Sequence, residues 1–283
     1  MPNNKQSFTD FILETNVTGS GKATSYIRAI DLLCDLIIRK PFGFDDCKNL
    51  WAVDSVERLQ ELYLFVLKEK NKKNQGDWVF DDIPPSYLRD GYCSAALKSY
   101  QEFLVEQAYE LKLLSTFDEH RGDESEVIQK LDTDIEYPGF LIEGLDKRQG
   151  EEVIRSVRVR SNQHVFRKII LSIYNQSCCI TGLNIPEINR ASHIIPWAKD
   201  ETKRLDPRNG LCLSATYDAA FDRNIISLDD DYRILISKNI KDYGTRQNIK
   251  EYFLNKEGKK IFLPQRYKPN KDYLAAHRKN CEF

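Results

Sequence analysis

One short stretch in the last third of the chain limits the possible folds more than any other feature. Two short apolar runs, 188–195 and 210–213, have the length and composition of β-strands, and residues 215–223 have the pattern of a short helix. A polar loop separates the two runs, and the turn dipeptide Asn209-Gly210 ends that loop. The order predicts a compact strand–loop–strand–helix unit.

Two side chains of this unit suit phosphodiester hydrolysis, which needs an activated water and positive charge for the transition state. His193 stands at the end of the first run, and histidine is mostly neutral at working pH, as a general base must be. Asp218 opens the short helix, and carboxylates are ligands for Mg²⁺ and Mn²⁺. Each also has an ordinary explanation: His193 as a half-buried strand residue, and Asp218 as an acid favoured by the helix dipole.

Four segments in this order resemble the HNH, or ββα-metal, nucleases, closest to the zinc-free branch found in bacterial restriction-type nucleases. They are Cys178-Cys179-Ile180-Thr181-Gly182, Ala191-Ser192-His193-Ile194-Ile195-Pro196, Asn209-Gly210-Leu211 and Tyr217-Asp218-Ala219-Ala220-Phe221-Asp222. The resemblance implies that His193 is the general base and that Asp218 binds a single Mg²⁺ or Mn²⁺. It also implies that Asn209 ties the loop and so orients the base. Asp222, four residues after Asp218, can be a second metal ligand or can only stabilise the helix.

The sequence departs from the family pattern in three places. Ser192 stands where many members have an aspartate that binds metal, and Tyr217-Asp218 replaces the final histidine. No CxxC pair occurs, so we expect no structural zinc. Two alternatives to a DNA endonuclease therefore stay open: a catalytically weakened DNA-binding module, and a nuclease that acts on RNA.

The charge is divided unevenly along the chain. Residues 1–152 carry 18 Lys+Arg against 29 Asp+Glu, whereas residues 153–283 carry 24 against 14, a net charge of +10. A basic half of this kind indicates a module that binds a polyanion, and the resemblance to the HNH nucleases implies that this polyanion is double-stranded DNA. The side chains that we expect to contact nucleic acid are polar or basic and belong to the helix before the motif or to its loop: Arg160, Gln163, Arg167, Lys168, Lys203, Arg204 and Arg208.

These patterns predict an α+β protein of three parts. Residues 1–115 form a mostly helical N-terminal domain for target recognition or dimerisation, with apolar stripes at Tyr26–Ile37 and Leu97–Leu111. Residues 116–152, with 12 acidic and 4 basic side chains, form an acidic connector, and residues 153–283 form the nuclease domain. Two N-terminal segments are similar to parts of bacterial restriction-type proteins: Gly19–Tyr26 and Tyr92–Leu104. Since one such site cuts one strand, we expect a homodimer.

Several other classes are excluded. The sequence has no apolar stretch of about 18 residues and no basic-then-apolar leader, so we expect no membrane span. Seven cysteines without a regular spacing favour reduced thiols and a cytoplasmic protein. The segment Thr18–Lys22 looks like a phosphate-binding loop, but Asn16 and Ala23 break the required pattern, so we expect no nucleotide cofactor.

Overall fold

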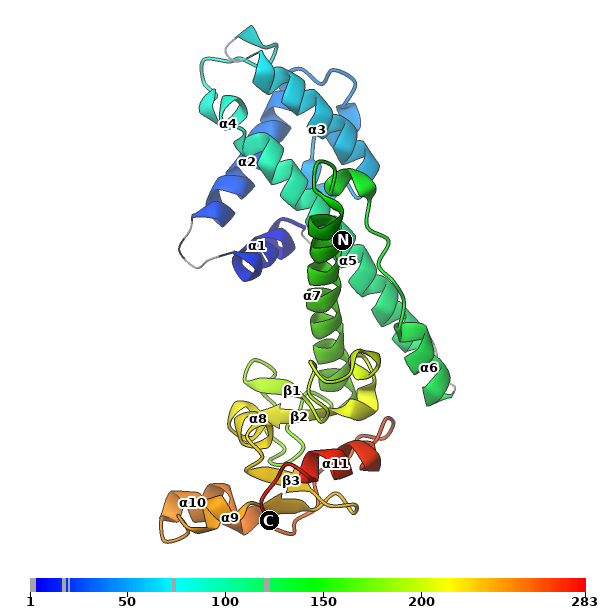
Figure 1. The fold of residues 1–283 in the computed structure, drawn as a ribbon. Helices are drawn as coiled ribbons and strands as arrows, with labels where there is room; N and C mark the ends of the chain where they lie inside the picture. Colours follow the sequence, from blue (N-terminus) through cyan, green and yellow to red (C-terminus); the bar gives the residue numbers. More distant parts are fainter. Residues whose placement is uncertain (1–3, 17–18, 20, 73–74, 120–122) are drawn as a thin grey trace. The chain divides into compact units, whose positions relative to one another are not determined.

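The computed structural model describes residues 4–16, 19, 21–72, 75–119 and 123–283, and it divides into two compact units. The first, called the helical unit here, contains residues 1–108 and 136–154. The second, called the nuclease unit, contains residues 109–135 and 155–283. Figure 1 shows the order of the elements in both. Part of the Thr18–Lys22 segment lies outside the described residues.

The helical unit packs its helices around one apolar core. Its described elements are α1 (Asn4–Thr15), α2 (Lys22–Arg39), η1 (Asp45–Cys47), η2 (Leu50–Ala52), α3 (Val56–Asn71), α4 (Ser86–Arg89), the first half of α5 (Tyr92–Glu119), η4 (Gly139–Leu141) and the first turns of α7 (Lys147–Ile173). The apolar face of α2 is buried in this core at Ile30, Leu33 and Ile37. The predicted stripe at Tyr26–Ile37 therefore supplies the unit's own core.

The predicted stripe on α5 is only partly buried. Leu97 and Leu104 are buried in the core of the helical unit, but Leu111 is 60% exposed. Tyr109 and Leu113 are buried in its place, within the core of the nuclease unit. Helix α5 contributes first to the core of the helical unit and then to the core of the nuclease unit, so its buried face changes along its length. The single apolar stripe Leu97–Leu111 predicted from the sequence was therefore wrong for the second half of the helix.

The nuclease unit combines helices with two small antiparallel sheets. Its described elements after α5 are α6 (Glu124–Leu131), α7, β1 (Asn189–His193), η5 (Glu201–Lys203), η6 (Pro207–Asn209), β2 (Gly210–Ser214), α8 (Ala215–Asp222), β3 (Ile226–Leu228), β4 (Ile234–Ile236), α9 (Lys238–Lys241), α10 (Gln247–Tyr252), η7 (Leu254–Lys256) and α11 (Lys271–Arg278). Strand β1 pairs with β2, and β3 pairs with β4. In the first pair His193 lies opposite Gly210, and Ser192 lies opposite Leu211.

Both faces of the β1–β2 hairpin are covered, which fixes its register. Leu211 and Leu213 of β2 are buried, and α8 packs against both strands. The C-terminal half of α7 contributes Phe166, Ile169 and Ile170 to the same core. This hairpin and helix lie where the sequence predicts two strands and a short helix.

The acidic stretch 116–152 contains regular structure. Asp123 is the N-cap residue of helix α6, and its side chain accepts a hydrogen bond from the Ser125 amide. Its apolar residues Val127 and Leu131 are fully buried in the core of the nuclease unit. The stretch is thus divided between the two units, its first part in the nuclease unit and its second in the helical unit.

The predicted α+β class is confirmed, since a helical region precedes a region of small sheets and helices. No helix within the described residues has both the length and the hydropathy needed to cross a membrane.

Candidate active site

His193 is the last residue of β1, and aromatic rings hold its imidazole on two sides. The ring of Phe166, on α7, stacks on the imidazole at 3.6 Å between centroids and 14° between planes. The indole of Trp197 meets it edge-on at 5.3 Å. These contacts restrict rotation of the imidazole and remove part of its hydration, so the ring is held in one orientation before any ligand arrives.

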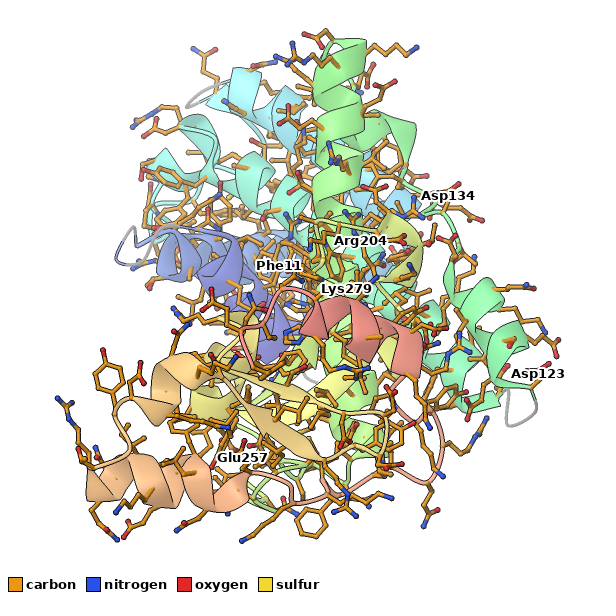
Figure 2. The ribbon with its side chains drawn as sticks, turned by 60° about the horizontal axis from the view of Figure 1, so that its bottom comes forward. Phe11, Asp123, Asp134, Arg204, Glu257 and Lys279 are labelled. Atoms are coloured by element: carbon orange, nitrogen blue, oxygen red, sulfur yellow. The ribbon has the colours of Figure 1, made fainter. Side chains whose placement is uncertain are left out.

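One hydrogen bond decides which nitrogen of His193 carries the proton. Nε2 lies 3.1 Å from the backbone oxygen of Arg204, in the loop between the strands (Figure 2 labels Arg204). Because a carbonyl oxygen only accepts hydrogen bonds, Nε2 must donate, and Nδ1 of the neutral ring keeps its lone pair. Burial lowers the pKa of His193 to about 4, so the ring is neutral at physiological pH.

Asn209 holds the ends of this loop together with its side chain, which is 1% exposed. Its Oδ1 accepts a hydrogen bond from the Ile195 amide at 2.7 Å. Its Nδ2 donates to the backbone oxygens of Ile195 and Lys203, at 3.2 and 3.1 Å. Since Lys203 precedes Arg204, the amide fixes the backbone that orients His193.

Gly210 allows α7 to approach the hairpin beside His193. A Cβ atom at this position would lie 2.7 Å from Cγ1 of Ile170 and 2.9 Å from Cζ of Phe166, both closer than van der Waals contact. Overpacking of this kind costs about 1–3 kcal/mol. The ring displaced would be Phe166, on which the imidazole of His193 stacks.

Helix α8 begins directly after β2 and carries Asp218 and Asp222 one turn apart. Asp218 is half-buried and Asp222 is exposed. Within the part of the chain that the structure describes, neither carboxylate has a hydrogen bond or an ion pair. Partial loss of hydration, and then the negative charge of Asp218, raise the pKa of Asp222. The neighbouring Arg223 partly offsets this rise without forming an ion pair. Two adjacent carboxylates that form no ion pair favour a bound cation.

The base and the carboxylates line one open cleft of about 640 Å³. Ser192 lines it too, and its buried hydroxyl has no hydrogen-bond partner among the described residues. The set of oxygen donors (Ser192, Asp218 and Asp222) is the type that Mg²⁺ and Mn²⁺ prefer, so the residues present fit one divalent cation. The structure therefore brings His193, Asp218 and Asp222 to one place, whereas Asn209 acts through the loop behind them.

The basic residues that line the cleft are Arg190 and Lys199, both exposed. Lys199 follows Trp197 in the basic loop, whose lysines and arginines suit phosphate contacts on sequence grounds alone. Arg190 precedes the motif residues on β1 and was not predicted, because its only sequence signal is its closeness to His193. They put positive charge beside the place where a phosphate would enter.

The side chains predicted to contact nucleic acid lie outside this cleft, and several have partners within the protein. In the loop, Lys203 pairs with Asp200 at 2.7 Å, Arg204 with Glu201 at 3.0 Å, and Arg208 with the buried Asp206 at 3.0 Å. On α7, Arg167 donates to the backbone oxygens of Pro186 and Asn189, Lys168 pairs with Glu110, Gln163 is exposed and Arg160 is half-buried. The loop cations and Arg167 thus stabilise the fold around the motif.

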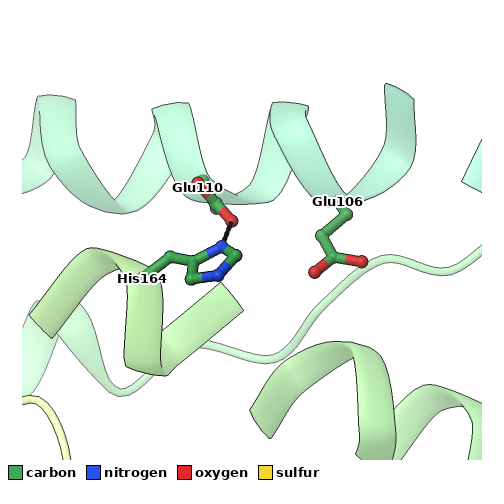
Figure 3. Close-up of side chains that lie close together, drawn as sticks. All are labelled: Glu106, Glu110 and His164. Atoms are coloured by element: carbon green, nitrogen blue, oxygen red, sulfur yellow. Dashed lines mark hydrogen bonds and ion pairs between the residues drawn. The ribbon is translucent and has the colours of Figure 1, made fainter. Parts of the chain in front are cut away.

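Glu110 of α5 binds two side chains of α7. Its carboxylate lies 2.9 Å from Nδ1 of His164 and 3.0 Å from Nζ of Lys168. Figure 3 shows the Glu110–His164 contact, with Glu106 one turn earlier on α5. The sequence around His164 gives no sign of this partner, because Glu110 lies 54 residues earlier in the chain.

His277 of α11 also lines the cleft, although it is only 6% exposed. Its ring stacks on Phe221 at 3.9 Å, Nε2 donates to the Phe221 backbone oxygen, and Nδ1 lies 2.9 Å from the Ser227 hydroxyl. Both ring nitrogens are occupied, so this histidine holds the end of α8 in place. No local signal could have shown this, because its partners lie about 50 residues away in the sequence.

The cysteines of the motif region are core residues. Cys178, Cys179 and Cys212 are all at most 1% exposed. Burial raises the pKa of Cys212 to about 12 and that of Cys179 well above its ordinary value. The protonated thiols pack as small apolar groups.

Comparison with protein families gives a match over this same region. The model of the HNH endonuclease family matches residues 178–229, which contain β1, the loop, β2 and α8. The chain carries an HNH endonuclease domain. The match covers under a fifth of the chain, and a comparison with the curated proteins gives no match. The HNH domain makes this protein a phosphodiester hydrolase whose substrate is a nucleic acid, and HNH nucleases generally use a divalent cation. The predicted HNH motif and the predicted enzyme class are confirmed.

Proposed function

We propose that this protein is an endonuclease of double-stranded DNA that uses one Mg²⁺ or Mn²⁺ ion and has no structural zinc. The observation that carries the proposal is the cleft itself. It combines a histidine whose Nδ1 lone pair is held available with two carboxylates, Asp218 and Asp222, that form no ion pair among the described residues. A base and a cation site on one phosphate are what in-line hydrolysis requires.

In the proposed reaction Nδ1 of His193 removes a proton from a water molecule as the water oxygen bonds to phosphorus. The bond between phosphorus and the 3′ oxygen breaks, which leaves a 5′-phosphate and a 3′-hydroxyl after solvent protonates the leaving oxygen. A pKa near 4 makes His193 a weak base in the free protein. A phosphate in the cleft raises that pKa, because an adjacent negative charge stabilises the imidazolium.

Asp218, assisted by Asp222, would hold the cation, and the buried Ser192 hydroxyl, which has no hydrogen-bond partner among the described residues, is a candidate neutral oxygen ligand. A divalent cation bound there supplies positive charge for the phosphorane and the leaving oxygen. The carbonyl of Arg204 stabilises the imidazolium as it forms, because Nε2–H already donates to it at 3.1 Å. Asn209 keeps that carbonyl in place, so its role is to position the base.

The first test is cleavage of supercoiled plasmid by the purified full-length chain in Mg²⁺ or Mn²⁺. We expect nicked or linear DNA with either ion and intact plasmid in EDTA. Double-stranded and single-stranded RNA of matched length serve as competing substrates. Cleavage of RNA alone would assign the protein to RNA. Binding of plasmid without cleavage in either ion would instead support the weakened DNA-binding module, which the serine at position 192 motivates.

We propose a restriction or defence role for the protein, with the helical N-terminal region (1–115) as its recognition or dimerisation part. The support is the similarity of Gly19–Tyr26 and Tyr92–Leu104 to segments of restriction-type proteins. The core of the helical unit buries the apolar face of α2, so that face is not available for pairing. A dimer would have to use other surface, for example around Leu13 and Ile38, which are 60% and 57% exposed.

We expect the active form to be a homodimer. One base and one cation cut one strand, so a two-fold pair matches the two antiparallel strands of a duplex. Light scattering at micromolar protein should give twice the mass of the 33.0 kDa chain. Linear plasmid should then appear early together with nicked circles. A monomeric mass with nicks that accumulate before any linear product would refute the dimer.

A further inference from the structure

The nuclease unit has a second concentration of positive charge, outside the HNH motif. Residues 238–260, called the basic lobe here, comprise α9, α10 and η7 and the loops around them. They include seven lysines and arginines against three acidic residues. The exposed positive side chains are Lys238, Lys241, Arg246, Lys250, Lys259 and Lys260.

Few of these charges are neutralised within the protein. Lys241 pairs with Glu257 at 2.6 Å. In the described part of the chain the other lysines and arginines of the basic lobe have no ion pair. Arg246 lies over the ring of Tyr243, 5.4 Å from its centroid, and that ring is 52% exposed. Tyr252 is 56% exposed. The surface thus offers cations and phenol hydroxyls together, and both are common donors to phosphate oxygens.

The basic lobe is anchored to the helix that carries the metal ligands. The hydroxyl of Tyr217, next to Asp218 on α8, donates to the backbone oxygen of Tyr252. The same ring meets Phe253 edge-on at 5.9 Å, and Phe253 and Leu254 pack against the core of the unit. Figure 1 shows α9 and α10, in orange, next to each other at the end of this unit. The lobe is therefore held at a fixed place relative to Asp218.

We infer that the basic lobe binds the sugar–phosphate backbone of duplex DNA beside the cleaved phosphate. The inference rests on the proposed function and adds a binding surface to it. Cations without acidic partners attract a polyanion, and each phosphate they neutralise releases condensed counterions. Such contacts are independent of base sequence, so the lobe adds affinity and orientation and leaves recognition to other surfaces. An acidic protein surface is the competing partner, and the experiment below separates the two.

The test is a salt titration of DNA binding by a full-length triple variant, Lys238→Gln with Arg246→Gln and Lys250→Gln. Binding to a fluorescent duplex is measured in EDTA, so that no cleavage occurs. The slope of log affinity against log salt should fall by about 0.9 for each phosphate that the variant no longer neutralises, roughly 2–3 in all. The cleavage rate at saturating DNA should stay close to the wild-type rate, since the cleft is untouched.

A matched variant removes three exposed positive charges from the first turns of α7, outside residues 1–115 and outside the basic lobe: Lys147→Gln, Arg148→Gln and Arg155→Gln. It should keep the wild-type slope. If both triple variants keep the wild-type slope of log affinity against log salt, or both lower this slope equally, the lobe is not a DNA-binding surface and the inference is wrong. Loss of affinity for an acidic polypeptide with unchanged affinity for the duplex overturns it in favour of a protein partner. Absence of cleavage by the wild type in every divalent ion would count against the proposed function, while the titration in EDTA still tests the lobe.

Discussion

His193→Ala is expected to lower the rate of plasmid cleavage by about 10²–10⁴-fold, the usual contribution of a general base. Affinity for duplex DNA should be nearly unchanged, because the imidazole stacks on Phe166, meets the edge of Trp197 and acts on water. The measurement is the single-turnover cleavage rate in saturating Mg²⁺ or Mn²⁺, alongside DNA binding in EDTA.

His164→Ala is the matched control, since that histidine lies in the same unit and pairs with Glu110. It should keep most of the wild-type rate. A His193→Ala protein that cuts at the wild-type rate would remove His193 from the mechanism. A loss of thermal stability in step with the loss of rate would mean that the imidazole matters through its packing.

Asp218→Ala should reduce cleavage and metal binding together. Loss of one group that stabilises transition-state charge typically costs about 10²–10³ in rate. The loss should be largest at low metal, and higher Mn²⁺ should restore part of it, because Asp222 and Ser192 stay in the cleft. Mn²⁺ binding by titration calorimetry gives a readout independent of activity.

The control for this variant is Asp231→Ala, which removes an exposed carboxylate of the nuclease unit from the turn between β3 and β4. It should leave both metal affinity and rate unchanged. If Asp218→Ala binds Mn²⁺ as tightly as the wild type and cuts DNA at low metal, the ligand lies elsewhere, and Asp222→Ala becomes the decisive variant.

The elements of the fold that depend on neighbouring residues in the chain could be predicted from the sequence. The strands β1 and β2 and the helix α8 follow the apolar runs and the turn dipeptide closely, because alternation of side chains and turn chemistry act over a few residues. The positions of His193 and Asp218 in one cleft followed from the resemblance to a known family, and the structure agrees with that placement.

Features that depend on contacts between residues far apart in the sequence could not be predicted. The burial of His277 depends on Phe221 and Ser227, more than 45 residues before it. The exposure of Leu111 depends on where α5 leaves one core and enters another. The partners of Arg167 are backbone oxygens of a loop, which carry no sequence signal. Basic side chains that suit DNA in a sequence can equally hold the protein together.

The two residues of the dipeptide Asn209-Gly210 contact two different parts of the nuclease unit. The amide of Asn209 is required by the loop, and the missing side chain of Gly210 is required by α7. Any larger residue at position 210 would collide with Ile170 and Phe166, and Phe166 is the ring on which the imidazole of His193 stacks. A substitution at either position of the dipeptide therefore disturbs the surroundings of the base, although neither residue takes part in the reaction directly.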